Sequence, residues 1–382
     1  MPTPMSDSAQ KKMQGLLDSL VQTGPELGLQ LCAYHHGVRV VDVCAGVADS
    51  ATRRPVTPDT LFPVFSVTKG VAATLLHILV ERGLIGYDTP IASVWPEFGA
   101  HGKGGITLRH AMSHQAGLPL LPAGLTPAQV CDWKTLAAAI ADAKPVTAPG
   151  QIMTYHAITF GSILGEVACR VTGKSFPQLL TQEVTGPLGL SDFFVGIPDR
   201  VESRIATVYD APAAPAEEPP PDPAEPRDIL PWMRPLGTFL TRPDVRRACL
   251  PAANGIMNAR DLASFYAALV PGGRNGRELL PPARVRTAVE QQALQWLPEL
   301  PVPRRMGLGY FLGGEGCPEL SSRPDAFGHG GYGGAVGYAD PSCGLAVGLT
   351  KNYLSISFAA PPVEPLRLTV LRQLRSALGL SE

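Results

Sequence analysis

The chain has 382 residues, of which 45% are hydrophobic and 17% are charged, and its formal net charge is −1. This is the balance of an ordinary globular protein, and the length allows two domains or one large domain with an insertion. A net charge near zero, without a block of Lys and Arg, excludes the electrostatic case for nucleic acid or an anionic membrane as a partner.

The N-terminal residues lack a basic segment followed by an apolar run, so no secretory signal is expected. No uninterrupted apolar stretch of about 18 residues predicts a membrane span. The seven cysteines are scattered and form no C-x-x-C pair. They predict reduced, buried thiols rather than disulfides or a zinc site, and therefore a cytoplasmic location. The sequence carries no signal for the oligomeric state.

The first part of the chain mixes helix and strand patterns. Residues 8–22 carry apolar side chains at helical spacing. Residues 29–34 and 38–45 predict a β-hairpin with His-His-Gly between its strands. Helical periodicity then extends over residues 67–81, and Gly83 is expected to end that helix.

The middle of the chain predicts short helices between loops that contain Gly and Pro. They are expected at 105–115, 127–143, 158–171, 175–185, 259–269 and 281–295. Residues 211–226 form a Pro/Ala/Glu tract that predicts an exposed, extended loop. A tolerated insertion is the favoured interpretation of this tract, and a lid is the alternative.

Strand patterns return near the end of the chain. Strands are predicted at 308–312, 334–339 and 345–349, and a last amphipathic helix is predicted at 363–379. Strands at both ends with helices between them predict an α/β (α+β) protein. We expect a domain built from residues 1–85 and 300–382, with a mostly helical region, 86–299, inserted into it.

The pattern S-x-x-K occurs twice, at Ser66-Val-Thr-Lys69 and at Ser8-Ala-Gln-Lys11. A serine hydroxyl is a poor nucleophile without a base beside it. Residues i and i+3 share one face of a helix, so Lys69 can reach the Ser66 hydroxyl, and a buried lysine loses its proton more readily. The alternative role for Ser66 is that of a helix N-cap.

Two further stretches carry candidate groups. Tyr155, in Pro149-Gly-Gln-Ile-Met-Thr-Tyr-His156, lies at a loop–helix junction, where a tyrosine near a cation can relay protons. Its neighbour His156 is a candidate proton shuttle or substrate contact, and the favoured alternative is a satisfied surface histidine. Tyr155 could also be plain core packing.

The second stretch is Phe327 to Pro341, which holds six glycines in fifteen residues before a predicted strand. Such glycines allow close approach of a ligand or of another backbone segment. Within it, His329, Gly330 and Gly331 are candidates for substrate contact, and the N–H of Tyr332 is a candidate oxyanion donor together with the N–H of Ser66. A glycine-rich turn without function is the alternative.

In this order, Ser66-Val-Thr-Lys69, Tyr155-His-Ala157 and His329-Gly-Gly331 resemble the motifs of the β-lactamase and penicillin-binding-protein superfamily. The chain is most similar to class C β-lactamase-like esterases, called family VIII carboxylesterases. The resemblance covers roughly residues 10–380 and extends to L-R-H-A-M-S-H-Q-A-G-L-P at 108–119 and A-N-G-I-M-N-A-R-D-L-A at 253–263. It implies an antiparallel sheet flanked by terminal helices, with a helical domain inserted and the active site between them.

Two positions depart from the β-lactamase pattern. Ala157 stands where those enzymes carry an asparagine that contacts the drug's amide, and His329 stands where they carry a lysine that holds its carboxylate. Histidine is mostly neutral at pH 7, whereas lysine is charged. Both changes favour an uncharged ester over a β-lactam, and the chain also lacks the G-x-S-x-G elbow of α/β-hydrolases.

The resemblance therefore implies a carboxylesterase acting on a small-molecule ester through an acyl-enzyme on Ser66, with no metal and no organic cofactor. Lys69 and Tyr155 would be its acid–base groups, and which of them is the primary base is left open. Alternatives are an acyltransferase on the same fold, a weak β-lactamase or D-aminopeptidase, and a binding module without catalysis. Three intact catalytic residues argue against the last.

Overall fold

The computed structural model describes residues 7–24, 26–211, 227–296, 302–314, 320–354 and 366–381. Among these, a nine-stranded sheet has the order β3-β2-β1-β13-β12-β11-β10-β9-β8, and its neighbouring strands are antiparallel. Its strands are β1 Gly28–His35, β2 Val38–Asp49, β3 Arg54–Pro55, β8 Ala293–Gln295, β9 Arg304–Met306, β10 Phe311–Leu312, β11 Phe327–Gly330, β12 Val336–Asp340 and β13 Leu345–Lys351. Because β1 pairs with β13, the two ends of the chain meet inside the sheet.

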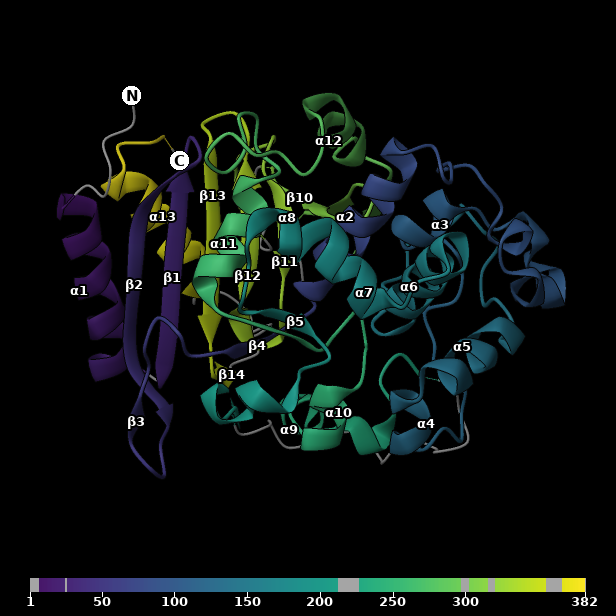
Figure 1. Cartoon of the computed structure of the whole chain (residues 1–382), viewed down its shortest axis with the longest axis horizontal. Coiled ribbons are helices and arrows are strands. Elements are labelled where there is room, and N and C mark those ends of the chain that lie inside the picture. The colour runs from purple at the N-terminus through teal and green to yellow at the C-terminus, as the bar shows by residue number, and fades with distance from the viewer. Residues whose placement is uncertain are drawn as a thin grey trace.

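Helices cover both faces of this sheet (Figure 1). Helices α1 (Asp7–Thr23) and α13 (Leu366–Ala377) share a hydrophobic cluster with Leu29 and Leu31 of β1. The next residue of β1, Cys32, faces the other way, into the cluster that contains Leu262 of α11 (Ala259–Ala267). Successive side chains of a strand point to opposite faces, so β1 is buried along nearly its whole length.

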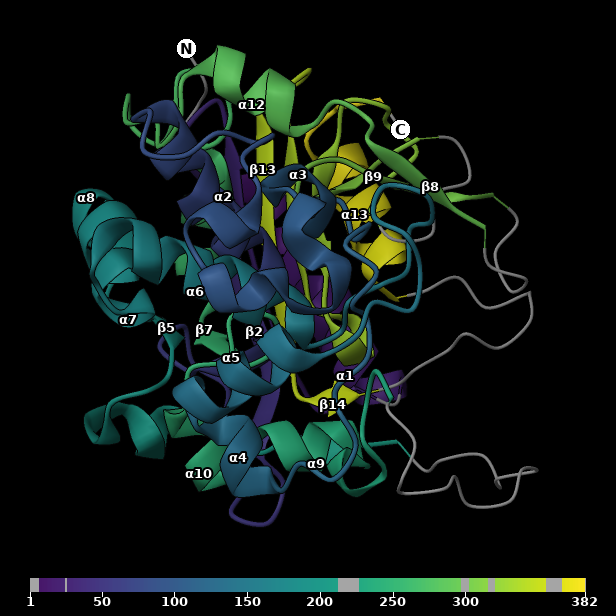
Figure 2. The same ribbon diagram turned by 90° about the vertical axis from the view of Figure 1, so that its right-hand side faces the viewer.

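The helical part of the chain lies beside the sheet, as Figures 1 and 2 show. Its helices are α2 Thr68–Glu81, α3 Leu108–Met112, α4 Pro127–Cys131, α5 Trp133–Asp142, α6 Thr159–Thr172, α7 Phe176–Leu180, α8 Gly186–Leu188, α9 Leu236–Leu240, α10 Pro243–Arg247 and α12 Pro282–Ala288. A three-stranded sheet has the order β4 (Phe62–Phe65), β7 (Gly255–Met257) and β5 (Phe193–Val195). Strands β6 (Tyr209–Asp210) and β14 (Tyr353–Leu354) form a short parallel pair.

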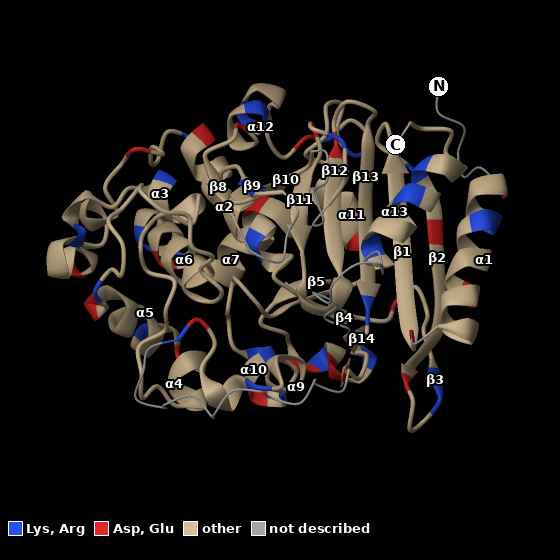
Figure 3. Ribbon diagram, turned by 180° about the vertical axis from the view of Figure 1, so that it is seen from behind, with Lys and Arg blue, Asp and Glu red and all other residues tan. Residues whose placement is uncertain are grey.

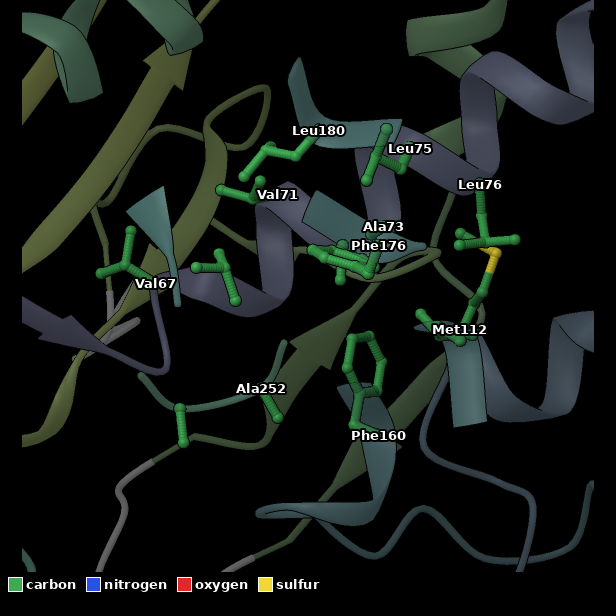
Figure 4. Packing of buried hydrophobic residues seen from close by; sticks show 14 of the residues in the cluster. Val67, Val71, Ala73, Leu75, Leu76, Met112, Phe160, Phe176, Leu180 and Ala252 are labelled. Carbon is green, nitrogen blue, oxygen red and sulfur yellow. The ribbon is translucent and has the colours of Figure 1, made fainter. Parts of the chain in front are cut away.

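Helix α2 is the buried element around which these parts pack. Its residues 68–79 are all buried, so this part of the helix has no face toward solvent. Figure 4 shows Val71 and Leu75 of α2 in one cluster with Phe160 of α6 and Met112 of α3. This packing holds the first turn of α2, which carries Lys69 and follows directly on Ser66, in one fixed place.

Several predicted elements differ in extent from the observed ones. The predicted helix 281–295 is wrong in its second half, where β8 joins the main sheet. The predicted strand 308–312 is reduced to Phe311–Leu312, and the glycine-rich 327–330 is itself a strand, β11. Strands of two to four residues are too short to show a period in the sequence. The tract 211–226 lies, except for residue 211, outside the described residues.

The antiparallel sheet with flanking helices and a helical region agrees with the expected class C β-lactamase-like fold. The division into 1–85 with 300–382 and an inserted 86–299 remains a proposal. Two elements of the inserted range, α11 and β8, pack against or join the main sheet, so they belong with the sheet in such a division.

Charged residues are interspersed along the described chain (Figure 3), in keeping with the net charge of −1. None of the helices that the structure describes is both long enough and apolar enough to cross a bilayer.

Candidate active site

Ser66 lies in the turn between β4 and α2. The residue before it, Phe65, is buried and has φ of +50°, a left-handed conformation that costs a non-glycine residue about 1 kcal/mol or more. Helix α2 begins at Thr68, its N-cap residue is Val67, and no side chain caps it. The interpretation of Ser66 as an N-cap is therefore wrong, and its partly exposed hydroxyl is left for another role.

Lys69 is completely buried, and its amine lies 3.1 Å from Ser66 Oγ. The same Nζ donates to the carbonyl oxygens of Ala157 (2.8 Å) and Ala252 (2.9 Å). Burial holds the pKa of Lys69 well below its ordinary value. A neutral amine has two N–H donors and one lone pair, so with both carbonyls satisfied the lone pair is left for the Ser66 hydroxyl. This geometry suits removal of the serine proton.

Gly161 and Thr68 fix the backbone segments around Lys69. A Cβ on Gly161 of α6 would lie 2.3 Å from the backbone of Pro251 and Ala252, so only glycine lets the Ala252 carbonyl come this close. The Thr68 hydroxyl accepts the N–H of Gly255 in β7 and donates to the carbonyl of Phe65. Strand β7 is thereby tied to the turn that carries Ser66.

Tyr155 is half-buried at the loop before α6, and its ring lies beside two basic side chains. Lys69 Nζ is 4.7 Å and the guanidinium carbon of Arg304 is 5.8 Å from the ring centroid. The rings of Phe311 and His329 are centred 6.0 and 6.1 Å away. The structure thus brings together the tyrosine, the lysine and the histidine of the three sequence motifs.

The glycine-rich segment meets the serine turn through a close backbone contact. A Cβ on Gly331 would lie 2.3 Å from the carbonyl oxygen of Val64 in β4. Next to it, the rings of Tyr332 and Phe65 are centred 5.7 Å apart. Within the described chain, the N–H groups of Ser66 and Tyr332 donate to no protein acceptor. Both amides therefore lie at this junction, and each N–H can still donate a hydrogen bond.

His329 and Gly330 lie in β11 and pair with β12. The His329 ring is almost fully buried, its Nδ1 is 2.7 Å from the Gly330 carbonyl oxygen, and it is centred 4.3 Å from the ring of Phe311. Its place between Tyr155 and the β11 backbone is compatible with the expected contact to substrate, which remains a proposal.

His156 is placed differently from the expectation. It is fully buried, its Nδ1 lies 2.5 Å from the Thr154 carbonyl oxygen, and its Nε2 accepts the N–H of Leu118. Burial lowers its pKa to about 4, so the ring is neutral at pH 7. Both ring nitrogens are engaged by the backbone, which corrects the expectation of a proton shuttle or substrate contact: His156 is a structural residue.

The second S-x-x-K sequence is an ordinary surface feature. Ser8 and Lys11 are exposed residues of α1, which packs on the outer face of the main sheet. The two copies thus differ in burial, which lowers the pKa of Lys69 and favours the neutral amine that can accept a proton.

Sequence reasoning missed three kinds of group at this site. The carbonyls of Ala157 and Ala252 leave no signal, because any residue type supplies a carbonyl. Arg304 was passed over because β9 is only three residues long. His114, centred 4.8 Å from the Tyr155 ring, lies in the stretch 108–119 that carried the family resemblance, and this was its one available signal.

The family model described as Beta-lactamase matches residues 17–362, and the chain belongs to that family. It is 36% identical over 348 residues to the esterase/beta-lactamase LipL of Mycobacterium tuberculosis, covering 86% of this chain and 77% of LipL. Among solved structures it is similar to a family VIII carboxylesterase (TM-score 0.83, 30% identity, 98% of each chain covered). It is also similar to a penicillin-binding-protein homologue from Caulobacter crescentus (TM-score 0.82, 30% identity, 99% of each chain covered). The chain is a hydrolase of the β-lactamase fold.

Proposed function

We propose that this chain hydrolyses carboxylic esters through an acyl-enzyme on Ser66. The observation that carries the proposal is the buried Lys69, whose Nζ lies 3.1 Å from Ser66 Oγ and is held by two backbone carbonyls. The names of the esterase relatives, LipL and the family VIII carboxylesterase, support ester hydrolysis as the reaction.

In the proposed first step, neutral Lys69 takes the hydroxyl proton while Ser66 Oγ forms a bond to the ester carbonyl carbon. The carbonyl oxygen becomes an oxyanion and accepts hydrogen bonds from the N–H groups of Ser66 and Tyr332. The bond to the alkoxy group then breaks, and the leaving alcohol takes a proton from Tyr155, which regains it from Lys69. The short contact to Ser66 supports Lys69 as the primary base and Tyr155 as the relay.

In the second step, water attacks the acyl-enzyme carbonyl and gives its proton to the same groups. The bond to Ser66 Oγ breaks, the carboxylic acid leaves and the serine hydroxyl is restored. Lys69 and Arg304 both lie beside the Tyr155 ring, and once Lys69 has taken the serine proton both are cations that favour the transient phenolate of the relay.

The residues beside the site favour an uncharged small ester. Ala157 supplies its carbonyl to Lys69 and has no side-chain amide for a β-lactam. His329 brings an imidazole where β-lactamases of this type carry a lysine, so the permanent charge of a lysine, suited to a drug carboxylate, is missing from that position. The cytoplasmic location remains a prediction.

Intact-protein mass spectrometry tests the proposal. Wild type and Ser66→Ala are mixed separately with p-nitrophenyl butyrate and with a fluorophosphonate. We expect p-nitrophenol release and a covalent adduct with wild type, and neither with a folded Ser66→Ala. A folded wild type with no adduct and no turnover would refute the mechanism and favour a binding module.

A further inference from the structure

His114 lies in the turn after α3 and is completely buried. Its backbone has φ of +60°, a left-handed conformation uncommon outside glycine, asparagine, aspartate and histidine. The ring has no place in the proposed proton transfers. A strained, buried, polar residue beside the reacting groups needs a reason of its own.

His114 holds the backbone on both sides of Tyr155. Its carbonyl oxygen accepts the N–H of Thr154 at 3.0 Å, and its Nδ1 accepts the N–H of His156, also at 3.0 Å. The residue before and the residue after Tyr155 are thus fixed by one histidine. A rotation of the peptide units around Tyr155 would break at least one of these bonds.

The ring of His114 also contacts the phenol directly. Its centroid is 4.8 Å from the Tyr155 ring and 4.6 Å from the ring of Phe160 in α6. Phe160 belongs to the buried cluster around α2, whose first turn carries Lys69 (Figure 4). His114 therefore joins the catalytic tyrosine to the rigid core that also holds the lysine.

The ring must be neutral to do this. A protonated Nδ1 would oppose the His156 N–H that it accepts, so the proton of the neutral ring is on Nε2. Burial lowers the pKa of His114 well below its ordinary value, and the nearby basic groups lower it further. Those groups are His156, Lys69, His329 and Arg304. A neutral ring adds no charge next to the amine that must lose its proton.

We propose that His114 is a positioning residue for Tyr155. It sets the place of the phenol through the Nδ1 hydrogen bond and the ring contact, and it touches no reacting atom. This inference rests on the proposed function, because it gives His114 a purpose only if Tyr155 relays protons.

Two substitutions separate the two contacts. In His114→Asn, the side-chain oxygen can replace Nδ1 as acceptor and the backbone keeps its left-handed conformation, while the ring is lost. In His114→Ala both contacts are lost. The matched control is His77→Asn, since His77 is also fully buried, bonded at both nitrogens to Tyr87 and Leu308, and stacked on Tyr310.

We expect kcat to fall by about 10-fold in His114→Asn and about 10²-fold in His114→Ala, with little change in KM. A misplaced Tyr155 phenol slows the chemical step and leaves substrate binding largely unchanged. The pH profile of kcat/KM should shift in both variants, and His77→Asn should lose stability without that shift. Esterase turnover and thermal unfolding of each folded variant give these values. If His114→Ala does not fold, the comparison of His114→Asn with wild type and with His77→Asn tests the positioning role.

The inference is overturned if both His114 variants keep the wild-type kcat, or if the loss falls on KM. It is also overturned if asparagine is no better than alanine, or if His77→Asn shifts the profile equally. Fluorophosphonate labelling of Ser66 separates this failure from that of the proposed function. An unlabelled, inactive wild type refutes the esterase mechanism itself, whereas a labelled, active wild type with unaffected His114 variants refutes only the positioning role.

Discussion

Gly161 lies where α6 passes the segment that supplies the Ala252 carbonyl to Lys69. In Gly161→Ala, the new Cβ would lie 2.3 Å from Ala252 N and from the carbonyl carbon of Pro251. Ordinary contact begins at 3.4 Å, so the segment must move by about 1 Å, and the atoms that must move are backbone. The hydrogen bond from Lys69 Nζ to Ala252, now 2.9 Å, would be stretched beyond its normal range.

A shift of this size has a definite expected cost. A misplacement of about 1 Å at a catalytic group can lower kcat by about 10²-fold. Overpacking costs about 1–3 kcal/mol, and alanine returns about 1 kcal/mol through its helix propensity, so we expect a net loss of about 0–2 kcal/mol in the free energy of unfolding.

The assay measures p-nitrophenyl butyrate turnover together with urea unfolding for Gly161→Ala and wild type. The matched control is Gly15→Ala, because Gly15 lies on the exposed side of α1 with no atom within 4 Å of a new Cβ. The control should raise stability by about 0.5–1 kcal/mol and leave kcat unchanged. A Gly161→Ala protein with wild-type kcat and stability would show that the Ala252 carbonyl does not position Lys69.

Two further predictions concern the catalytic pair and a buried ion pair. Lys69→Ala and Tyr155→Phe should each lower kcat by about 10²-fold or more. The double variant should be little slower than the slower single variant, because the two residues act together in one proton transfer. If the kinetic assay shows that the fold-losses of the two single variants multiply in the double variant, the residues act independently. Arg375 and Asp340 form a buried pair at 2.8 Å between α13 and β12. Burial alone would raise the pKa of Asp340, but hydrogen bonds from Ser342 and Arg375 lower it overall. A carboxyl with a lowered pKa stabilises the fold above its unfolded pKa, and this contribution is lost as the pH falls through the folded pKa. Arg375→Met should therefore cost about 3–5 kcal/mol in urea unfolding at pH 7 and markedly less near pH 3; a pH-independent cost would contradict this assignment.

Much of the site's chemistry could be anticipated from short stretches of sequence. The contact between Ser66 and Lys69 needs only one helical turn, and the apolar residues after Lys69 predict a buried helix. Tyr155 was a candidate because it precedes an apolar helical run, and His329 because of the glycines around it. Each of these signals is local, so each could be found without knowing the fold.

Other predictions failed where a local signal does not exist or misleads. The glycine-rich 327–330 was placed before the predicted strand and not within one, because glycine disfavours strands, yet pairing with β10 and β12 makes this segment a strand, β11. His156 was a candidate because it neighbours Tyr155, but its burial and its two backbone partners come from Leu118 and Thr154.

The sequence by itself determined that a serine and a lysine three residues apart would lie close together at the start of a helix, that strands would lie at both ends of the chain, and that the chain resembles the β-lactamase family. Only the tertiary structure decided which lysine is buried, so that its amine is more easily neutral, and what surrounds it. The carbonyls that hold Lys69 are 88 and 183 residues away along the chain. Any residue type has a carbonyl, so no pattern marks these two. Burial that lowers a pKa is likewise a property of the packed interior, and it distinguishes Lys69 from the exposed Lys11 although both stand in the same four-residue motif.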